Sequence, residues 1–266
     1  MADEQHPASI ADSSKPNAGR IYDYVLGGHH NFEVDRLAAQ EFLKIVPDYP
    51  QMARYVRWFL GEAVCRLSED GFTQFIDFAS GLPTRDHIHM ITPRGTKVIY
   101  SDIDPVTVAY GQEIIKDVPE ADYLACDASK PENLLNSRVV AELFGHSHKV
   151  AIGFNGVAFF LTDEQVGHAI KTLYDWAEKG SRLFLCDFDF VEAQNAIPYA
   201  DEGTKMWERM GQAMHWRSLS RLRELVAPWN EGDGFKPAEE WVEAKLREKD
   251  KKTPLVDRLR CAILEK

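Results

Sequence analysis

The sequence predicts an α/β protein with a mostly parallel sheet of seven strands and helices on both faces. From residue 71 onward, short apolar runs alternate with helical stretches, which is the pattern of successive strand–helix–strand units. The chain has 266 residues, of which 44% are hydrophobic, so it is long enough to bury a sizeable core in one domain.

The chain before this alternation divides into two parts. Residues 1–16 are mostly Ser, Asp, Pro and Ala with little to bury, and we expect them to be disordered. From residue 17 the sequence becomes organised: a mixed apolar and polar run over 20–26 stops at a pair of glycines. Residues 32–45 and 52–68 carry apolar residues at helical spacing and are predicted helices.

The strands and helices of the alternating part follow in order. Predicted strands cover 74–78, 97–101, 121–126, 149–154 and 182–188. Predicted helices cover 105–116, which opens with a proline, then 163–179, 203–214 and 219–226. A pair of strands near 235–242 and 260–264 completes the sheet, and one strand near the C-terminus is expected to be antiparallel.

Composition and charge exclude several classes of protein. Asp+Glu number 42 against 31 for Lys+Arg, and this balance argues against general binding to nucleic acid. No run of about 18 apolar residues predicts a membrane span, and no apolar segment follows the polar start. Four widely spaced cysteines suggest free thiols, so we expect a cytoplasmic protein without membrane contact. Nine histidines show no spacing that suits zinc, and no metal site is expected.

Small and acidic residues follow the first three predicted strands. The first strand runs into a turn over residues 77–84, the second ends at Asp102 and the third at Asp127. In open α/β sheets, ligands bind beyond the carboxyl ends of the strands. Asp102 is placed to accept from ribose hydroxyls and Asp127 from an exocyclic amine, which predicts a pocket for a nucleoside-like ligand. The alternative is that both aspartates only cap helices.

The turn over residues 77–84 also bears on which cofactor binds. A dinucleotide site prefers G-x-G-x-x-G, because the pyrophosphate must approach the backbone closely. The turn here has one glycine, Gly81, followed by Leu82 and Pro83. This favours a cofactor without phosphate, such as S-adenosylmethionine. A nucleotide-dependent oxidoreductase on the same fold remains an alternative.

Three segments carry a family resemblance. Residues 20–36 read R-x-Y-D-Y-x-L-G-G-x-x-N-F-x-x-D-R, residues 77–84 read D-x-x-x-G-L-P-T and residues 100–105 read Y-x-D-x-D-P. Together they resemble the actinobacterial-type S-adenosylmethionine-dependent methyltransferases, a family long catalogued as a domain of unknown function. The resemblance runs from about residue 17 to the C-terminus.

This resemblance implies a class I (Rossmann-like) methyltransferase fold, with a helical cap over 17–70 and a core over 71–266. It implies S-adenosylmethionine as cofactor and a small-molecule acceptor methylated on O, N or C. The implied cofactor-binding residues are Tyr22, Gly28, Asn31, Asp77, Ala79, Gly81, Thr84, Asp102, Ile103, Asp127, Ala128 and Asn155.

The chain departs from the family pattern at three places. Ala79 stands where relatives have a glycine-containing turn, His29 and His30 follow the paired glycines, and Phe159 stands near a position where relatives often carry a histidine. A protein that binds the cofactor without turnover, or serves as a scaffold, is therefore a second alternative.

No catalytic residue is assigned, and three candidates are considered. His29 or His30 is a candidate general base near neutral pH if the cap brings it to the methyl group, and otherwise a surface or capping residue. Asn155 follows the fourth strand, where many class I methyltransferases hold acceptor-side polar groups. A Met- and Trp-rich stretch over 206–216 lines an apolar acceptor pocket, or else belongs to the core or to a homodimer contact.

Overall fold

The computed structural model describes residues 14–83, 86–190, 197–232, 234–242 and 253–266. These residues form a seven-stranded sheet in the order β3-β2-β1-β4-β5-β7-β6. The strands are β1 (Gln74–Asp77), β2 (Lys97–Asp102), β3 (Ala121–Ala125), β4 (Ala151–Gly153), β5 (Arg182–Phe188), β6 (Lys236–Pro237) and β7 (Leu259–Glu265). Strands β1 to β5 run parallel, while β7 is antiparallel to both β5 and β6. The predicted fold class is confirmed.

Helices precede the sheet and alternate with its strands. Before the sheet come α1 (Ala18–Val25), α2 (Glu33–Ile45) and α3 (Tyr49–Glu69). Between the strands lie α4 (Ile88–Ile91), α5 (Pro105–Ile115), α6 (Glu132–Leu135), α7 (Arg138–Phe144), the 3-10 helix η2 (Ala158–Phe160) and α8 (Asp163–Trp176). The remaining helices are α10 (Ala200–Arg209), α11 (Leu219–Val226), α12 (Ala238–Trp241) and α14 (Pro254–Asp257).

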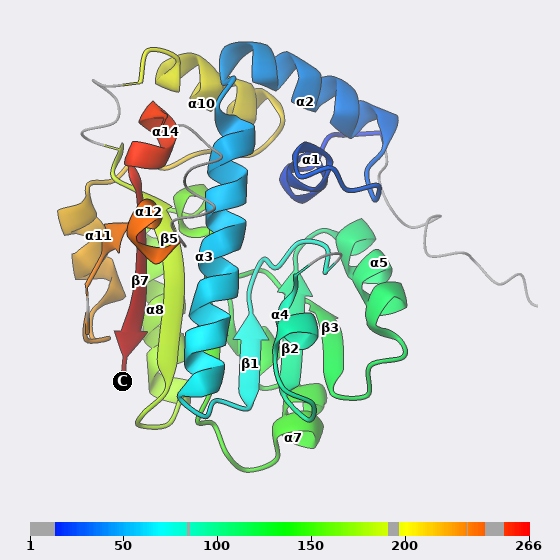
Figure 1. Cartoon of the computed structure of the whole chain (residues 1–266), viewed down its shortest axis with the longest axis vertical. Helices are drawn as coiled ribbons and strands as arrows, with labels where there is room; N and C mark the ends of the chain where they lie inside the picture. Colours follow the sequence, from blue (N-terminus) through cyan, green and yellow to red (C-terminus); the bar gives the residue numbers. More distant parts are fainter. Residues whose placement is uncertain (1–13, 84–85, 191–196, 233, 243–252) are drawn as a thin grey trace, which may run out of the picture.

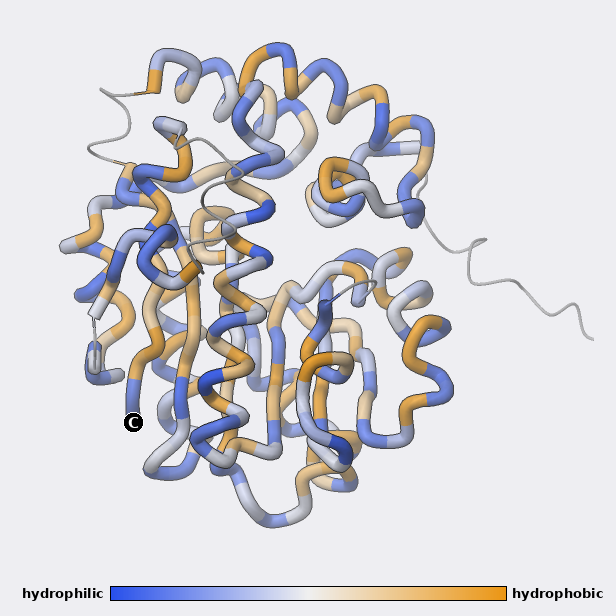
Figure 2. Tube along the Cα trace, viewed as in Figure 1, coloured by the Kyte–Doolittle hydropathy of each residue, from blue (hydrophilic) through white to orange (hydrophobic). Residues whose placement is uncertain are grey.

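The N-terminal helices lie over one edge of the sheet. Figure 1 shows α1 and α2 beyond the carboxyl ends of β1 and β2, with α3 running from there down alongside the sheet. Figure 2 shows hydrophobic and hydrophilic residues alternating along α2 and α3. The buried face of α3 includes Met52, Val56, Phe59, Ala63 and Leu67, at helical spacing. This face contacts β5, β7, α12 and α14, so α3 joins the cap to the sheet.

Two predicted elements differ from the structure. The helix predicted over 203–214 ends at Arg209, because Gly211 takes a positive φ of 82° that breaks the helical path. The strand predicted over 235–242 is limited to Lys236–Pro237, and the chain then turns into α12. Pro237 has no N–H for further pairing with β7, and Trp241 is buried with its Nε1 donating to the Cys261 carbonyl.

The disorder predicted for residues 1–16 falls almost entirely outside the described residues, which begin at residue 14. The described end is in contact with the cap, since Arg20 Nη2 donates to the Lys15 carbonyl at 2.7 Å. Within the described part of the chain, no helix has the length and apolar character needed to cross a membrane.

A buried arginine fixes the segment that follows α10. Arg217 donates to the carbonyls of Ala158 and Leu161 at 2.7 and 2.6 Å. It also forms ion pairs with Asp163 and with Asp187 at the end of β5. Because residues 210–218 have no helix or strand of their own, these bonds hold the segment against η2 and β5, beside the carboxyl edge of the sheet.

Candidate functional site

A cavity of about 400 Å³ opens between the cap and the carboxyl ends of the strands. This volume lies within the usual range for small-molecule sites, about 300–1,000 Å³. Its wall combines residues of α1, α2 and α3 with the ends of β1, β2, β3 and β4 and with the segment around α10. The site therefore lies where ligands bind in open parallel sheets.

The structure brings nine of the predicted cofactor-binding residues onto this wall. They are Tyr22, Asp77, Ala79, Gly81, Asp102, Ile103, Asp127, Ala128 and Asn155. All but Tyr22 follow or end one of the strands β1 to β4. We call this part of the cavity the strand-end half.

Hydrogen bonds hold the turn after β1 against β2 and β3. The Gly81 N–H donates to Asp102 Oδ2 at 3.2 Å, and the Tyr123 hydroxyl donates to the Gly81 carbonyl at 2.6 Å. Asp102 Oδ1 also accepts from the Asp104 N–H at 2.9 Å. Asp102 thus shapes the turn as well as facing the cavity, and each of its oxygens retains acceptor capacity for a ligand hydroxyl.

The backbone of this turn takes left-handed conformations. Gly81 has φ of 64°, which glycine adopts without cost. Ala79 has φ of 51°, where a residue with a Cβ is strained by about 1–2 kcal/mol. Since Ala79 stands where the family resemblance implies a glycine, the structure gives a physical reason for that glycine.

Burial changes the acidity of the two innermost carboxyls. It raises the pKa of Asp77 to about 6, against the opposing effects of the Ser80 hydroxyl and then the Arg57 charge. It also raises the pKa of Asp102 to about 6, although backbone N–H donors from Asp104 and Gly81 lower it. Both groups are ionised near neutral pH, and their negative charges favour a cationic ligand in this half.

The remaining polar groups of this half make local bonds. Asp127 Oδ1 accepts from the Ser129 N–H at 2.9 Å. Asn155 Nδ2 donates to the Val56 carbonyl of α3 at 3.4 Å, while its Oδ1 is buried with no partner among the described residues. The Tyr22 hydroxyl donates to the Ala53 carbonyl at 3.0 Å, and burial raises its pKa to about 12.

Four predicted residues do not line the cavity: Gly28, His29, His30 and Asn31. Thr84 lies outside the described residues. Asn31 and Gly28 build the loop between α1 and α2: Asn31 Nδ2 donates to Asp23 Oδ2 and to the Gly28 carbonyl. A Cβ on Gly28 would come within 2.0 Å of Asp23 Oδ1. His30 packs edge-on against Tyr110 of α5, with ring centroids 5.4 Å apart, and His29 is exposed. Neither histidine therefore faces the cavity.

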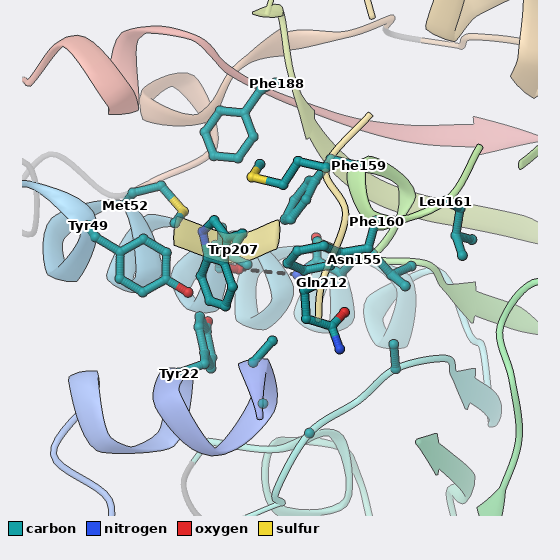
Figure 3. Close-up of a pocket in the computed structure, with 18 of the residues that line it drawn as sticks. Tyr22, Tyr49, Met52, Asn155, Phe159, Phe160, Leu161, Phe188, Trp207 and Gln212 are labelled. Carbon is teal, nitrogen blue, oxygen red and sulfur yellow. Dashed lines mark hydrogen bonds between the residues drawn. The ribbon is translucent and has the colours of Figure 1, made fainter. Parts of the chain in front are cut away.

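Aromatic and methionine side chains dominate the rest of the wall, and we call this group the aromatic lobe; Gln165, Thr204 and Gln212 also line the cavity. Its residues are Phe42, Tyr49, Met52, Phe159, Phe160, Phe188, Phe190, Tyr199, Trp207, Met214 and Trp216. Figure 3 shows Tyr49 and Met52 of α3, Phe159 and Phe160 of η2 and Trp207 of α10 gathered around one part of the pocket. Close ring contacts link these side chains; the ring centroids of Phe42 and Trp207, for example, are 4.9 Å apart.

Only part of the aromatic lobe was predicted from the sequence. Trp207, Met214 and Trp216 belong to the predicted apolar stretch, whereas Met206 and Met210 pack on the core. Phe42 and Met52 fell within apolar helix faces and carried no separate signal. Arg57 of α3, which also lines the cavity, was missed because nothing in a helix sequence shows which polar residue faces a neighbouring sheet.

With this geometry established, comparison with known proteins decides the family. A family model described as S-adenosyl methyltransferase matches residues 3–258. The chain belongs to the S-adenosyl methyltransferase family. This confirms the resemblance carried by the sequence motifs. The methyltransferase therefore uses S-adenosylmethionine, and the oxidoreductase alternative is not supported. No curated protein matches the sequence.

Solved structures share the methyltransferase's fold over nearly its whole length. A putative methyltransferase from Thermobifida fusca is 25% identical, covers 99% of each chain and superposes with a TM-score of 0.85. A DUF574 family protein from Streptomyces avermitilis is 23% identical with the same TM-score, and the match covers 96% of this chain and 99% of that one. A plantazolicin methyltransferase, 10% identical, shares the fold at 0.55 over 98% of this chain and 99% of that one.

The residues of the strand-end half fit this cofactor. Gly81, at positive φ, leaves space near the backbone, with no atom within 4 Å of an added Cβ. Asp102 and Asp127 present carboxylates along the cavity wall. Asp77 is buried, and its Oδ2 has no partner among the described residues. Buried polar atoms are normally hydrogen-bonded, so a free buried oxygen beside a cavity suits a ligand donor.

Proposed function

We propose that the methyltransferase acts on an uncharged, aromatic or largely apolar small molecule, which binds in the aromatic lobe. The observation that carries this proposal is the division of charge in the cavity. Arg57, Asp77, Asp102 and Asp127 are the charged side chains among its described lining residues, and none belongs to the aromatic lobe. A charged acceptor would lose its hydration there without a counter-charge.

Bound S-adenosylmethionine supplies an electrophilic methyl group on a sulfonium. The strand-end half binds the cofactor in this proposal, with Asp102 accepting from the ribose and Asp127 from the adenine amine. Aromatic rings hold the acceptor in the adjoining lobe and exclude water from it, which favours an in-line approach without a strong base. The Oδ1 of Asn155, which has no partner among the described residues, lies on the same wall. It can accept a hydrogen bond from an O–H or N–H group of the acceptor.

Methyl transfer from cofactor labelled in the methyl group tests this proposal. Two acceptor panels are compared: uncharged aromatic compounds and hydrophilic compounds such as sugars and amino acids. We expect label to enter only the aromatic panel. Transfer confined to the hydrophilic panel would show that the lobe does not select the acceptor.

A matched variant separates the two halves of the cavity. Phe160 is half-buried in the aromatic lobe, so Phe160→Ala removes a ring at limited cost to the fold. We expect kcat/KM for the best acceptor to fall by about tenfold or more, from loss of roughly 1.5 kcal/mol of ring contact. The Kd for S-adenosylmethionine, measured by calorimetry, should remain within twofold.

A further inference from the structure

Tyr49 of the aromatic lobe carries a hydroxyl group without a hydrogen-bond partner. The side chain is 9% exposed and lines the cavity, and it forms no hydrogen bond with another residue in the described part of the chain. Two other buried tyrosines have partners. The Tyr100 hydroxyl accepts from the His89 N–H at 2.9 Å. The Tyr123 hydroxyl donates to the Gly81 carbonyl at 2.6 Å. Because a buried hydroxyl without a partner costs free energy, the Tyr49 hydroxyl suits a ligand atom that accepts a hydrogen bond.

The surroundings of Tyr49 hold its ring in the aromatic lobe. The ring centroid lies 5.0 Å from that of Phe42, edge-on, and 6.1 Å from that of Trp207. The preceding residue, Asp48, accepts a hydrogen bond from the Tyr199 hydroxyl, across 151 positions of sequence. These contacts pack α2 and the segment around α10 against the start of α3. The Tyr49 side chain therefore has little freedom to turn away from the cavity.

The Tyr49 hydroxyl is a neutral donor. Figure 3 shows it pointing into the pocket, toward the side where Tyr22 lies. The Tyr22 hydroxyl already donates to the Ala53 carbonyl at 3.0 Å. Burial, together with the neighbouring Tyr22, raises the pKa of Tyr49 above its usual value. Tyr49 therefore keeps its proton near neutral pH, and its apolar surroundings favour a neutral oxygen as the partner over a charged one.

A second polar atom without a partner lies where the aromatic lobe meets the strand-end half. It is Asn155 Oδ1, and the Nδ2 of the same side chain donates to the Val56 carbonyl of α3. Val56 follows Tyr49 by about two turns of this helix, which is roughly 10 Å along the helix axis. Two polar groups at this spacing, along a wall of aromatic rings, match an elongated molecule that is polar at both ends.

We propose that Tyr49 selects the methyl acceptor by donating a hydrogen bond to a neutral oxygen, such as a carbonyl, at the end remote from the methylated atom. This inference rests on the proposed binding of an uncharged aromatic acceptor in the aromatic lobe. In this arrangement, the methylated atom lies toward Asn155 and the cofactor. An acceptor without the remote oxygen would leave the Tyr49 hydroxyl unpaired, and sites built to bond a polar group discriminate strongly against ligands that lack it.

Gln212 is a less selective contact for the same oxygen. Its side chain lines the cavity but is only half-buried. Water can therefore bond to its amide when no ligand is present, so that a ligand oxygen gains less there. The buried hydroxyl of Tyr49 gains more, because its alternative in the empty site is poorer.

Binding of matched acceptor pairs tests the assignment. The short pair is para-hydroxyacetophenone and para-isopropylphenol, and the long pair carries the same groups at the two ends of a biphenyl. Within each pair, a hydrocarbon group of similar shape replaces the carbonyl, and the phenol remains. Calorimetric titration into protein saturated with S-adenosylhomocysteine measures the Kd. We expect the ketone of at least one pair to bind about tenfold more tightly than its counterpart, the value of one good hydrogen bond. Equal affinities within both pairs would overturn the proposal.

One variant removes only the oxygen of Tyr49. In Tyr49→Phe we expect the preference for the ketone to disappear, while the Kd for S-adenosylmethionine stays within about twofold. The Tm without ligand should be unchanged or higher, because the hydroxyl has no partner in the fold to lose. Tyr24→Phe is the matched control. Tyr24 is half-buried on α1, does not line the cavity and bonds only to Gln40 at 3.4 Å, so this variant should keep the preference.

The remaining outcomes are distinguishable. If Tyr49→Phe lowers the Tm and weakens both members of each pair equally, the hydroxyl only supports the fold, and the proposal fails. It also fails if Tyr49→Phe weakens S-adenosylmethionine instead, since Tyr49 then serves the cofactor. Loss of the preference in Gln212→Leu, but not in Tyr49→Phe, would assign the oxygen to Gln212. If none of the four compounds binds the wild-type protein, the proposed aromatic acceptor falls as well.

Discussion

Arg20 of α1 donates from Nη1 to both carboxylate oxygens of Asp104, at 3.1 and 3.0 Å, across 84 positions of sequence. Asp104 caps α5 and follows Asp102 by two residues. The same guanidinium donates from Nε to Asp35 of α2 at 2.8 Å, and Arg20 and Asp35 are buried. One side chain therefore joins the first two helices of the cap, α1 and α2, to the end of the strand that carries Asp102.

The first prediction concerns this junction. Arg20→Met leaves the Asp35 carboxylate buried without its cation, and breaking a buried pair in this way typically costs about 3–5 kcal/mol. We expect the free energy of unfolding in urea to fall by that amount. Arg138→Met, which removes an exposed pair with Glu142, is the control and should cost less than about 1 kcal/mol.

If Arg20→Met does not fold, Asp104→Asn gives a milder test. It removes the charge that Arg20 meets at the sheet but keeps the pair with Asp35. We expect a smaller loss of stability and weaker S-adenosylmethionine binding, because the cap is held less firmly over the strand ends. Unchanged stability in both variants would contradict a role for Arg20 as the junction.

The second prediction is a pH dependence of cofactor binding. In the proposed placement the cationic cofactor binds in the half of the cavity that Asp77 lines, and the pKa of Asp77 in the folded protein is raised to about 6. At pH 5 such a group is about one-tenth ionised, so the Kd for S-adenosylmethionine should weaken by up to about tenfold from pH 7 to pH 5. Calorimetry at the two pH values measures this, and Asp77→Asn should show a smaller change.

The pH dependence of the free energy of unfolding, measured without ligand, should have the opposite direction. A carboxyl whose pKa is raised by folding favours the folded state when protonated. The contribution of Asp77 is therefore complete below about pH 4, its unfolded value, and is lost as the pH rises through about 6. Urea unfolding of wild type and Asp77→Asn at pH 4 and 7 isolates this contribution, and parallel curves would count against it.

The third prediction concerns backbone strain in the turn after β1. Ala79→Gly relieves the strain at φ of 51° but adds freedom to the unfolded chain, worth about 0.4–1 kcal/mol. We expect stability to stay constant or to rise by up to about 1 kcal/mol, with cofactor affinity retained or improved. Gly81→Ala should do the reverse and lower stability by about 1–2 kcal/mol. A loss of stability in Ala79→Gly would show that the turn is not strained.

The fourth prediction separates two roles for Asn31. The resemblance implies a cofactor contact, whereas the structure shows Asn31 bonded to Asp23, Gly28 and Arg36 within the cap loop. Asn31→Ala should lower the free energy of unfolding by about 1–3 kcal/mol and leave the cofactor Kd within twofold. A tenfold weaker Kd with unchanged stability would favour the cofactor contact instead. Glu33→Ala, at an exposed position of α2, is the control.

The order of the elements could be read from the sequence because it depends on local patterns. Apolar runs such as Phe75–Ile76 and Val98–Tyr100 are fully buried strands, and each is followed by a small or acidic residue. The predicted ends of α10 and β6 were less accurate: Gly211 stops α10 earlier than the apolar pattern indicated, and Pro237 leaves β6 shorter than predicted.

The residues of the candidate site likewise divide into those that the sequence predicts and those that only the fold places at the cavity. Asp77, Asp102 and Asp127 could be located because the carboxyl ends of parallel strands share one edge. The aromatic lobe could not, because its rings come from α2, α3, η2, β5 and α10, and an apolar residue on a helix looks the same whether it faces a core or a cavity. The positions of His29 and His30 also depended on how the cap loop folds.

The sequence by itself determined the fold class, the family, the cofactor and the strand ends that meet at the cavity, since each follows from the order of short local patterns along the chain. Only the tertiary structure decided which cap residues face the cavity. Contacts such as Asn155 with Val56, 99 positions apart, set the rotation of α3 against the sheet. That rotation brings Arg57 to the cavity wall, and local sequence does not encode it.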